Sequence, residues 1–146
     1  MNKAEIPGII IGKLMNIGGM IQRHGNKMLL PFNLNQQQFS IFFEIAKVGQ
    51  VKQKEMVNRL ELEKAHVSKV VKKLQQMELI TITQNGDDKR SYWLSVTGKG
   101  EELLKQCTEM FSKWNQEWIC EIDETELLSI VDNLDTLQKI FKEKTR

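Results

Sequence analysis

Residues 51–76 of this chain read VKQKEMVNRLELEKAHVSKVVKKLQQ, and this stretch decides the fold. Its first part predicts a short helix over 52–60, because the apolar side chains fall on one helical face. After a break at 61–63, apolar residues recur at helical spacing and predict a second helix. Two short helices joined by so tight a break indicate a helix-turn-helix. The inner stripe of the second helix contains Val67, Val70, Val71, Leu74 and Met77.

A β-hairpin is predicted directly after these two helices. Apolar and polar residues alternate over 80–83 and again over 92–96. The Asn85-Gly86 pair between the two runs is a strong signal for a hairpin turn. The predicted product is a two-stranded ribbon with a charged tip, and a helix-turn-helix followed by such a ribbon is a winged helix-turn-helix.

Longer helices are predicted on both sides of this region. Helices are expected over 9–30 and 35–47, and Asn35 and Gln38 stand at the spacing of a capping box. Thr97 is a suitable N-cap for a helix that extends to about residue 119. We therefore expect a mostly α fold with a small two-stranded β wing, in a single domain over 1–146. Within it, 34–100 is the winged lobe, and 1–33 with 101–146 is a helical lobe.

The final helix indicates self-association. Asp123 and Glu126 mark its start, and its apolar residues follow at alternating steps of three and four, which is the spacing of helices that pack on a partner. Because both terminal helices carry more apolar surface than one small winged domain can cover, we expect a homodimer. The apolar positions of the final helix are Leu127, Ile130, Leu134, Leu137 and Phe141.

Composition and charge place the chain among globular proteins with a local cationic surface. The chain has 146 residues, of which 40% are hydrophobic and 27% are charged. The net charge of +2 divides into +3 over 1–50, +4 over 51–100 and −5 over 101–146. Such asymmetry is typical either of a polyanion-binding surface or of a solvated surface with chance asymmetry. Two cysteines and no signal or membrane segment favour a cytoplasmic location, because the apolar run 6–17 is too short to span a bilayer.

The second helix of the pair and the ribbon tip carry the predicted DNA contacts. An α-helix fits the major groove of B-DNA, where serine, histidine and lysine side chains reach base edges. A narrow cationic ribbon suits the adjacent minor groove. A single surface lysine is more often only solvated, so the prediction depends on the order of the elements. The expected DNA-binding residues are Lys52, Gln53, His66, Ser68, Lys69, Lys72, Lys73, Asp88, Lys89 and Arg90.

Residues 34–104 resemble the MarR family of winged-helix transcriptional regulators. The most specific feature is the Asp-x-Arg wing followed by the Thr-x-x-Gly helix start. The resemblance implies that the first and last helices intertwine into a dimer and that the second helix of the pair enters the major groove. It assigns groove contacts to Ser68 and Lys69, a minor-groove contact to Arg90, and to Asp88 the orientation of Arg90 or of a base. The segments that carry it are LNQQQF (34–39), QKEMV (53–57), VSKVV (67–71), DKRS (88–91) and VTGKG (96–100).

Three positions depart from the family's pattern. Glu61 stands in the interhelical turn and Glu78 at the end of the second helix, where many members have Gly. A glutamate at positive φ is strained, so we expect the turn to be reshaped. Lys52 replaces the usual Thr or Ser, which loses a side-chain cap and adds a charge that attracts phosphate.

Cysteine and histidine offer little chemistry of their own. Cys107 lies on the apolar side of its helix, and we expect its acidic neighbours to raise the pKa of its thiol and slow oxidation. Cys120, beside Glu121, is similarly unpromising as a sensor of oxidants. His24 and His66 cannot build a histidine-rich metal site, so no metal or cofactor is expected. Because the chain contains no catalytic motif, it is predicted not to be an enzyme.

The leading hypothesis is a homodimeric transcriptional regulator, most often a repressor, that binds a pseudo-palindromic operator in double-stranded DNA. Trp114 and Trp118, one helical turn apart, either belong to an ordinary core or line a cavity for a small aromatic effector between the dimer and DNA-binding lobes. The rival hypothesis is a protein-interaction module or anti-repressor that keeps the winged fold without strong DNA binding. A third alternative is a small-molecule-binding protein with no affinity for DNA.

Overall fold

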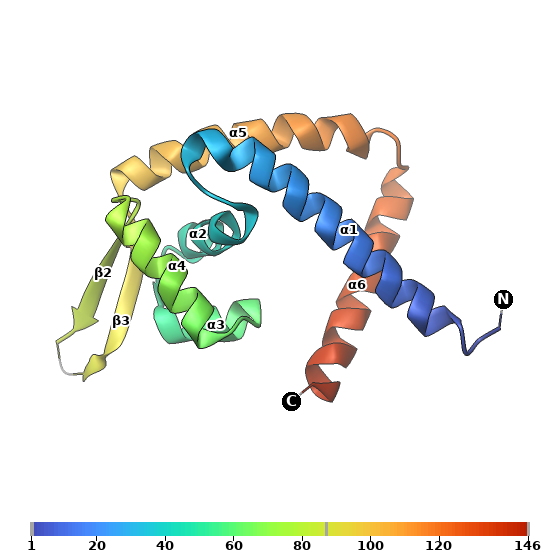
Figure 1. Ribbon diagram of the computed structural model, residues 1–146, viewed down its shortest axis with the longest axis horizontal. Helices are drawn as coiled ribbons and strands as arrows, with labels where there is room; N and C mark the ends of the chain where they lie inside the picture. The colour runs from blue at the N-terminus through green and yellow to red at the C-terminus, as the bar shows by residue number, and fades with distance from the viewer. Residues whose placement is uncertain (1, 87, 146) are drawn as a thin grey trace. The chain divides into compact units, whose positions relative to one another are not determined.

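The computed structural model describes residues 2–86 and 88–145, and the side chains of Asn85, Asp88 and Lys89 lie outside that description. The backbone forms two compact units, Met1–Cys107 and Thr108–Arg146, with the boundary inside one long helix. Figure 1 shows the elements and labels the six α-helices and strands β2 and β3. They are α1 (Ile6–Leu29), the 3-10 helix η1 (Leu30–Phe32), α2 (Gln36–Val48), β1 (Gln50–Lys52), α3 (Gln53–Leu60), α4 (Lys64–Gln76), β2 (Ile80–Asn85), β3 (Asp88–Val96), α5 (Gly98–Ile119) and α6 (Glu124–Lys144).

The start of α2 confirms the predicted capping box. The backbone N–H of Gln38 donates to Asn35 Oδ1 at 2.8 Å, and the backbone N–H of Asn35 donates to Gln38 Oε1 at 2.9 Å. Leu34 and Phe39 flank the cap and are both buried, as a hydrophobic staple requires. Gly49 ends the helix at φ 95°. The local sequence therefore determines both ends of α2.

The sheet has three antiparallel strands in the order β1-β3-β2, so the expectation of a two-stranded ribbon was incomplete. The β2–β3 hairpin is confirmed, with Ile82 opposite Leu94. The additional strand β1 places Val51 opposite Leu94, and both of these side chains are fully buried. A strand of three residues is too short to show alternation in the sequence. Lys52 consequently ends β1 and is the N-cap of α3, rather than lying within the helix.

The core of the first unit lies where α2, α3 and α4 gather beside the sheet (Figure 1). Four of the five residues predicted for the inner stripe of α4 are buried, and Met77 is half-buried. The apolar face predicted for α3 consists of Met56, which is buried, and Val57 and Leu60, which are half-buried. The largest fully buried side chains are Phe42, Leu29, Ile41, Ile45, Met56, Leu74, Leu79, Ile80 and Leu94.

The start of α5 fixes the base of the wing. The Thr97 hydroxyl accepts from the backbone N–H of Gly100 at 3.0 Å, which confirms the predicted cap, and it donates to the carbonyl of Glu78 at 2.7 Å. The backbone N–H of Thr97 donates to the carbonyl of Leu79 at 3.0 Å. A Cβ at Gly100 would collide with that same carbonyl oxygen and would lie 2.7 Å from Val96 Cγ1. Only glycine therefore fits at position 100.

The second unit consists of the end of α5 and all of α6. Asp123 is the N-cap of α6 and has an extended conformation. Its side chain makes no capping hydrogen bond with a described residue. Many apolar side chains of α6 are exposed within this chain. They are Leu128, Ile130, Val131, Leu134, Ile140 and Phe141, with exposed fractions of 40–61%. Across the described residues, we find no helix with the length and hydropathy that a transmembrane segment needs.

Candidate nucleic-acid interface

The C-terminal ends of α3 and α4 keep a regular backbone geometry, although a glutamate follows each helix. Glu61 and Glu78 both adopt the left-handed conformation, at φ 54° and 62°, where glycine is usual. After α4, the N–H of Glu78 donates to the Gln75 carbonyl at 2.9 Å and the N–H of Leu79 donates to the Leu74 carbonyl at 3.0 Å. This pair of bonds is a Schellman motif. Both glutamates therefore adopt the strained left-handed conformation, and the expectation that the turn is reshaped was wrong.

The exposed side of α4 carries cations and small polar groups. Lys69 and Lys72 are exposed, whereas Ser68 and His66 are half-buried. Neither lysine makes a hydrogen bond or an ion pair with any residue in the described ranges. Since the opposite side of α4 is buried in the core, this surface is available to an external partner.

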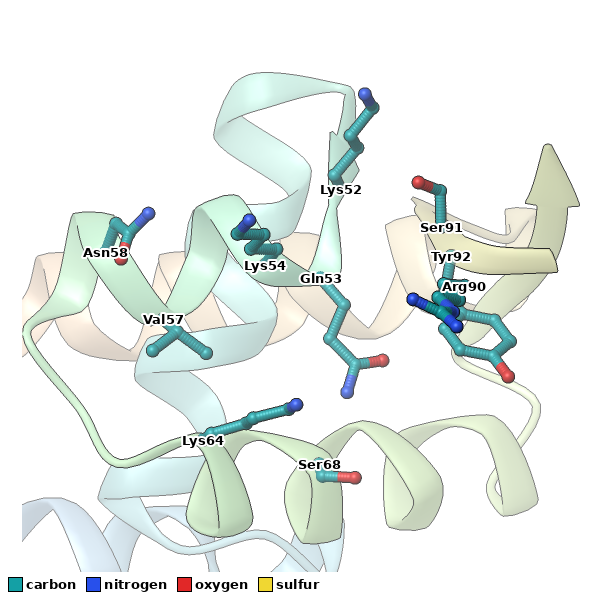
Figure 2. A pocket seen from close by; sticks show the side chains of 10 residues that line it. All are labelled: Lys52, Gln53, Lys54, Val57, Asn58, Lys64, Ser68, Arg90, Ser91 and Tyr92. Carbon is teal, nitrogen blue, oxygen red and sulfur yellow. The ribbon is translucent and has the colours of Figure 1, made fainter. Parts of the chain in front are cut away.

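A cleft of about 660 Å³ opens between the start of α3, the start of α4 and strand β3 (Figure 2). It contains Gln53, Ser68 and Arg90 from the predicted set, with Lys52 at its edge. Four of its lining residues are cationic and none is acidic, so the cleft is suited to a phosphate or another anion. Its lining residues are Lys52, Gln53, Lys54, Val57, Asn58, Lys64, Ser68, Arg90, Ser91 and Tyr92.

A second hollow of about 430 Å³ continues this surface along α4 toward the wing. Lys72 lines it, together with Gln53 and Ser68, which also line the first cleft. On α4, Lys64, Ser68 and Lys72 follow at steps of four, so they share one helical face. The two hollows therefore form one polar, cationic surface between the helix pair and β3.

Other predicted residues lie elsewhere or outside the description. Lys73 is half-buried, and its ammonium donates to Gln38 Oε1 at 3.2 Å, so it joins α4 to the capping box of α2. His66 lies on the same flank of α4 as Lys73, about 200° around the helix axis from Ser68. Neither residue lines the two hollows. The side chains of Asp88 and Lys89 lie outside the described residues.

Lys52 has a contact that no sequence pattern indicated. Its ammonium lies over the ring of Trp93, 5.2 Å from the centroid, in a cation–π arrangement. As expected from the loss of Thr or Ser, its side chain makes no capping bond. The position of Lys52 is set by β1, because Lys52 and Trp93 are paired residues of β1 and β3.

Sequence reasoning missed several residues that line the cleft. Lys54 and Asn58 come from α3, Lys64 from the first turn of α4, and Tyr92 from β3. The step of four from Lys64 to Ser68 was a usable signal. The position of Tyr92 depends on how the wing packs on the helix pair, so periodicity could not reveal it.

An ion pair fixes α3 against α2. Arg59 donates to Glu44 Oε1 through Nε at 3.1 Å and through Nη2 at 2.9 Å. Its charge is therefore compensated within the first unit. Arg59 serves the placement of α3 and not the cationic surface.

The remaining candidate chemistry is structural. Cys107 is fully buried, and burial raises the pKa of its thiol to about 11. The direction agrees with the prediction, but the cause is loss of solvation rather than the acidic neighbours. Cys120 is exposed and its thiol donates to the Glu117 carbonyl at 3.5 Å. In the described ranges, no three His, Cys, Asp or Glu side chains gather as a metal site would require.

The predicted effector residues form an aromatic pair in the second unit. The ring centroids of Trp114 and Trp118 are 6.4 Å apart and the rings are tilted by 58°. Trp118 Nε1 donates to Asn115 Oδ1 at 3.1 Å, and 39% of Trp118 is exposed. The pair is thus partly open to solvent, and its role as an effector site stays a prediction.

The sequence is similar to those of known transcriptional regulators. Residues 34–92 match the sequence model of the MarR family. The HTH-type transcriptional regulator BilQ of Clostridioides difficile (strain CD3) is 29% identical over 127 residues, which cover 87% of this chain and 86% of BilQ.

Two solved structures share the fold. A mutant MarR from E. coli complexed with operator DNA is 18% identical, with a TM-score of 0.78, over 93% of this chain and 99% of that one. The organohalide sensing RdhR-CbdbA1625 transcriptional regulator in the 2,4-dichlorophenol bound form is 20% identical, with a TM-score of 0.82, over 95% of this chain and 85% of that one. At these identities the likeness establishes a common architecture.

Proposed function

We propose that this chain is a repressor of the MarR family of transcriptional regulators and that it binds a pseudo-palindromic operator as a homodimer. The observation that carries this proposal is the cationic surface between α3, α4 and β3. α4 inserts into the major groove with Ser68, Lys69 and Lys72 toward the DNA. Arg90 of β3 enters the adjacent minor groove, and the cleft faces the backbone between the two grooves.

Exposed apolar side chains support the dimer. In addition to the residues of α6, α1 exposes Met15 at 72%, Met20 at 60% and Ile17 at 52%. A soluble monomer seldom leaves so many large apolar side chains in water. A second copy that covers the terminal helices would bury these side chains. The two copies of α4 would then be related by a two-fold axis and would meet DNA half-sites about 10 bp apart, or a small multiple of that spacing.

Release by a small aromatic effector is the finer part of the proposal. It is supported by the partly exposed Trp114–Trp118 pair and by the 2,4-dichlorophenol bound to a regulator of the same fold. An aromatic ligand that stacks on this pair would lower the affinity for DNA if it binds the DNA-free conformation more tightly. Thermal shift with phenolic compounds, followed by competition against bound DNA, tests this part separately.

The DNA-binding proposal is tested by selecting bound duplexes from a random library. We expect the recovered sequences to contain two inverted half-sites, because a dimer with a two-fold axis reads each half in the same way. If about 6–10 phosphates are neutralised, the affinity should fall about 10³–10⁵-fold between 50 and 200 mM salt. A protein that retards no duplex at low salt would instead favour the anti-repressor or protein-interaction alternative.

A further inference from the structure

Strand β1 places a lysine against an aromatic ring at the edge of the cationic cleft. In the antiparallel pair of β1 and β3, Lys52 is directly opposite Trp93, so the two side chains lie on the same face of the sheet. The neighbouring pair, Val51 and Leu94, points into the core. Lys52 therefore cannot turn inward, and its ammonium lies 5.2 Å from the Trp93 ring centroid.

The ring holds the ammonium without cancelling its charge. Among the residues described, the Trp93 face is the one partner of Lys52 Nζ, and no carboxylate pairs with it. Arg59 shows the opposite case, because Glu44 compensates its charge. A lysine side chain has four flexible bonds, so an ammonium that is already held near one position loses less entropy when it binds an anion.

The position of Lys52 relative to the cleft suits a backbone contact. Figure 2 shows Lys52 at the edge of the cleft, with its side chain directed away from Gln53 and Ser68. An ammonium in this position lies beside the surface that reads the grooves. It is therefore placed for a phosphate of the DNA strand and not for a base edge.

We propose that Trp93 is a positioning residue that holds the Lys52 ammonium where it binds a phosphate of the DNA backbone. This inference rests on the proposed DNA binding. It also gives a role in DNA binding to Lys52, the N-cap residue of α3, whose side chain makes no capping hydrogen bond.

A double-mutant cycle on the selected duplex tests the proposal. Trp93→Leu should weaken binding about 2–5-fold per protomer, or roughly 4–25-fold for a dimer, since an exposed cation–π contact has about that strength. In a Lys52→Ala background the same Trp93→Leu change should have no effect. Trp93→Phe, which keeps a ring, should recover part of the affinity. Lys139→Ala on α6, which removes one charge outside the cleft, is the matched control and should leave the affinity unchanged.

Salt dependence separates the two residues. Lys52→Ala removes one phosphate contact per protomer, so the slope of log affinity against log salt should fall by about 2 for a dimer. Trp93→Leu keeps the charge, so the affinity should fall while the slope stays close to that of the wild type. Equal loss from Trp93→Leu with and without Lys52 would mean that Trp93 acts only through sheet stability, and this result would overturn the proposal.

A measurement without DNA distinguishes this proposal from the proposed function. In the free protein, the Lys52 Hε protons should show an upfield ring-current shift that disappears in Trp93→Leu and persists in part in Trp93→Phe. An unshifted Lys52 resonance in the wild type overturns the positioning role even if DNA binds tightly. If the wild type binds no duplex, the proposed function and the phosphate contact both fail, whatever the Lys52 resonance shows.

Discussion

Alanine at Gly100 and alanine at Gly98 should have opposite effects on stability, although both residues lie in the first turn of α5. At Gly100, a Cβ meets the Leu79 carbonyl oxygen and Val96 Cγ1. That carbonyl also accepts the backbone N–H of Thr97, so it cannot withdraw without disturbing the bond that joins the end of α4 to the start of α5. At Gly98, a Cβ has no neighbour within 4 Å among the described residues.

The magnitudes follow from these surroundings. Gly98→Ala should raise the free energy of unfolding by about 0.4–1 kcal/mol, because the unfolded chain loses conformational freedom and the folded chain gains no clash. Gly100→Ala adds a methyl group to a filled space, which costs about 1–3 kcal/mol. The difference between the two variants should thus be about 1.5–4 kcal/mol in urea titrations followed by circular dichroism. Equal stability of the two variants would refute the close approach of Gly100 to Leu79.

Further predictions concern the strain at Glu78, the groove contacts and the two thiols. Glu78→Gly should raise the free energy of unfolding by about 1–2 kcal/mol, because glycine adopts the left-handed conformation without strain, whereas Glu78→Ala keeps the Cβ and should give no such gain. Arg90→Ala should weaken binding most on A·T-rich flanks, where the minor groove is narrow, and Lys72→Ala should weaken all sequences alike; equal effects in titrations of both duplexes would remove the minor-groove contact. A thiol reagent at pH 8 should modify Cys120 in the folded protein and Cys107 only after unfolding, and early loss of both thiols would contradict the burial of Cys107. The pKa of Cys107, raised from 9.0 to about 11, also sets a pH dependence. Between these values the unfolded thiol loses its proton while the folded thiol keeps it, so stability should fall by about 2–3 kcal/mol from pH 9 to 11 in the wild type beyond any change in Cys107→Ala.

Local chemistry made most of the fold predictable. The capping box at Asn35 and the cap at Thr97 are short-range signals, and both were confirmed, as was the β2–β3 hairpin that the Asn85-Gly86 pair indicated. Strand β1 was missed because it owes its existence to β3, forty residues later, and not to its own three residues. Pairing between distant segments leaves little trace in a window of sequence.

The site was predictable in its elements but not in its side-chain directions. The outward face of α4 was correct for Lys69 and Lys72. Lys73 is only one residue further, yet one hundred degrees of rotation turn it toward Gln38 of α2. The partner of Lys52 depended on the register of an unpredicted strand. Helical phase therefore gives a face, whereas the packing of neighbouring elements decides which cations on its edges remain available.

The glutamates at the helix ends bear on the choice between a DNA-binding regulator and a protein-interaction module. These glutamates would favour the protein-interaction module only if they distorted the helix pair of α3 and α4. Glu61 and Glu78 instead adopt positive φ, and the backbone hydrogen bonds of both helix ends are retained, including Leu62 N–H to the Val57 carbonyl at 3.3 Å. Their cost, about 1–2 kcal/mol each, is thus a cost in stability and not in the geometry that presents α4. Since that geometry and a cleft with four cations are both present, the departures from the family's pattern no longer count against DNA binding.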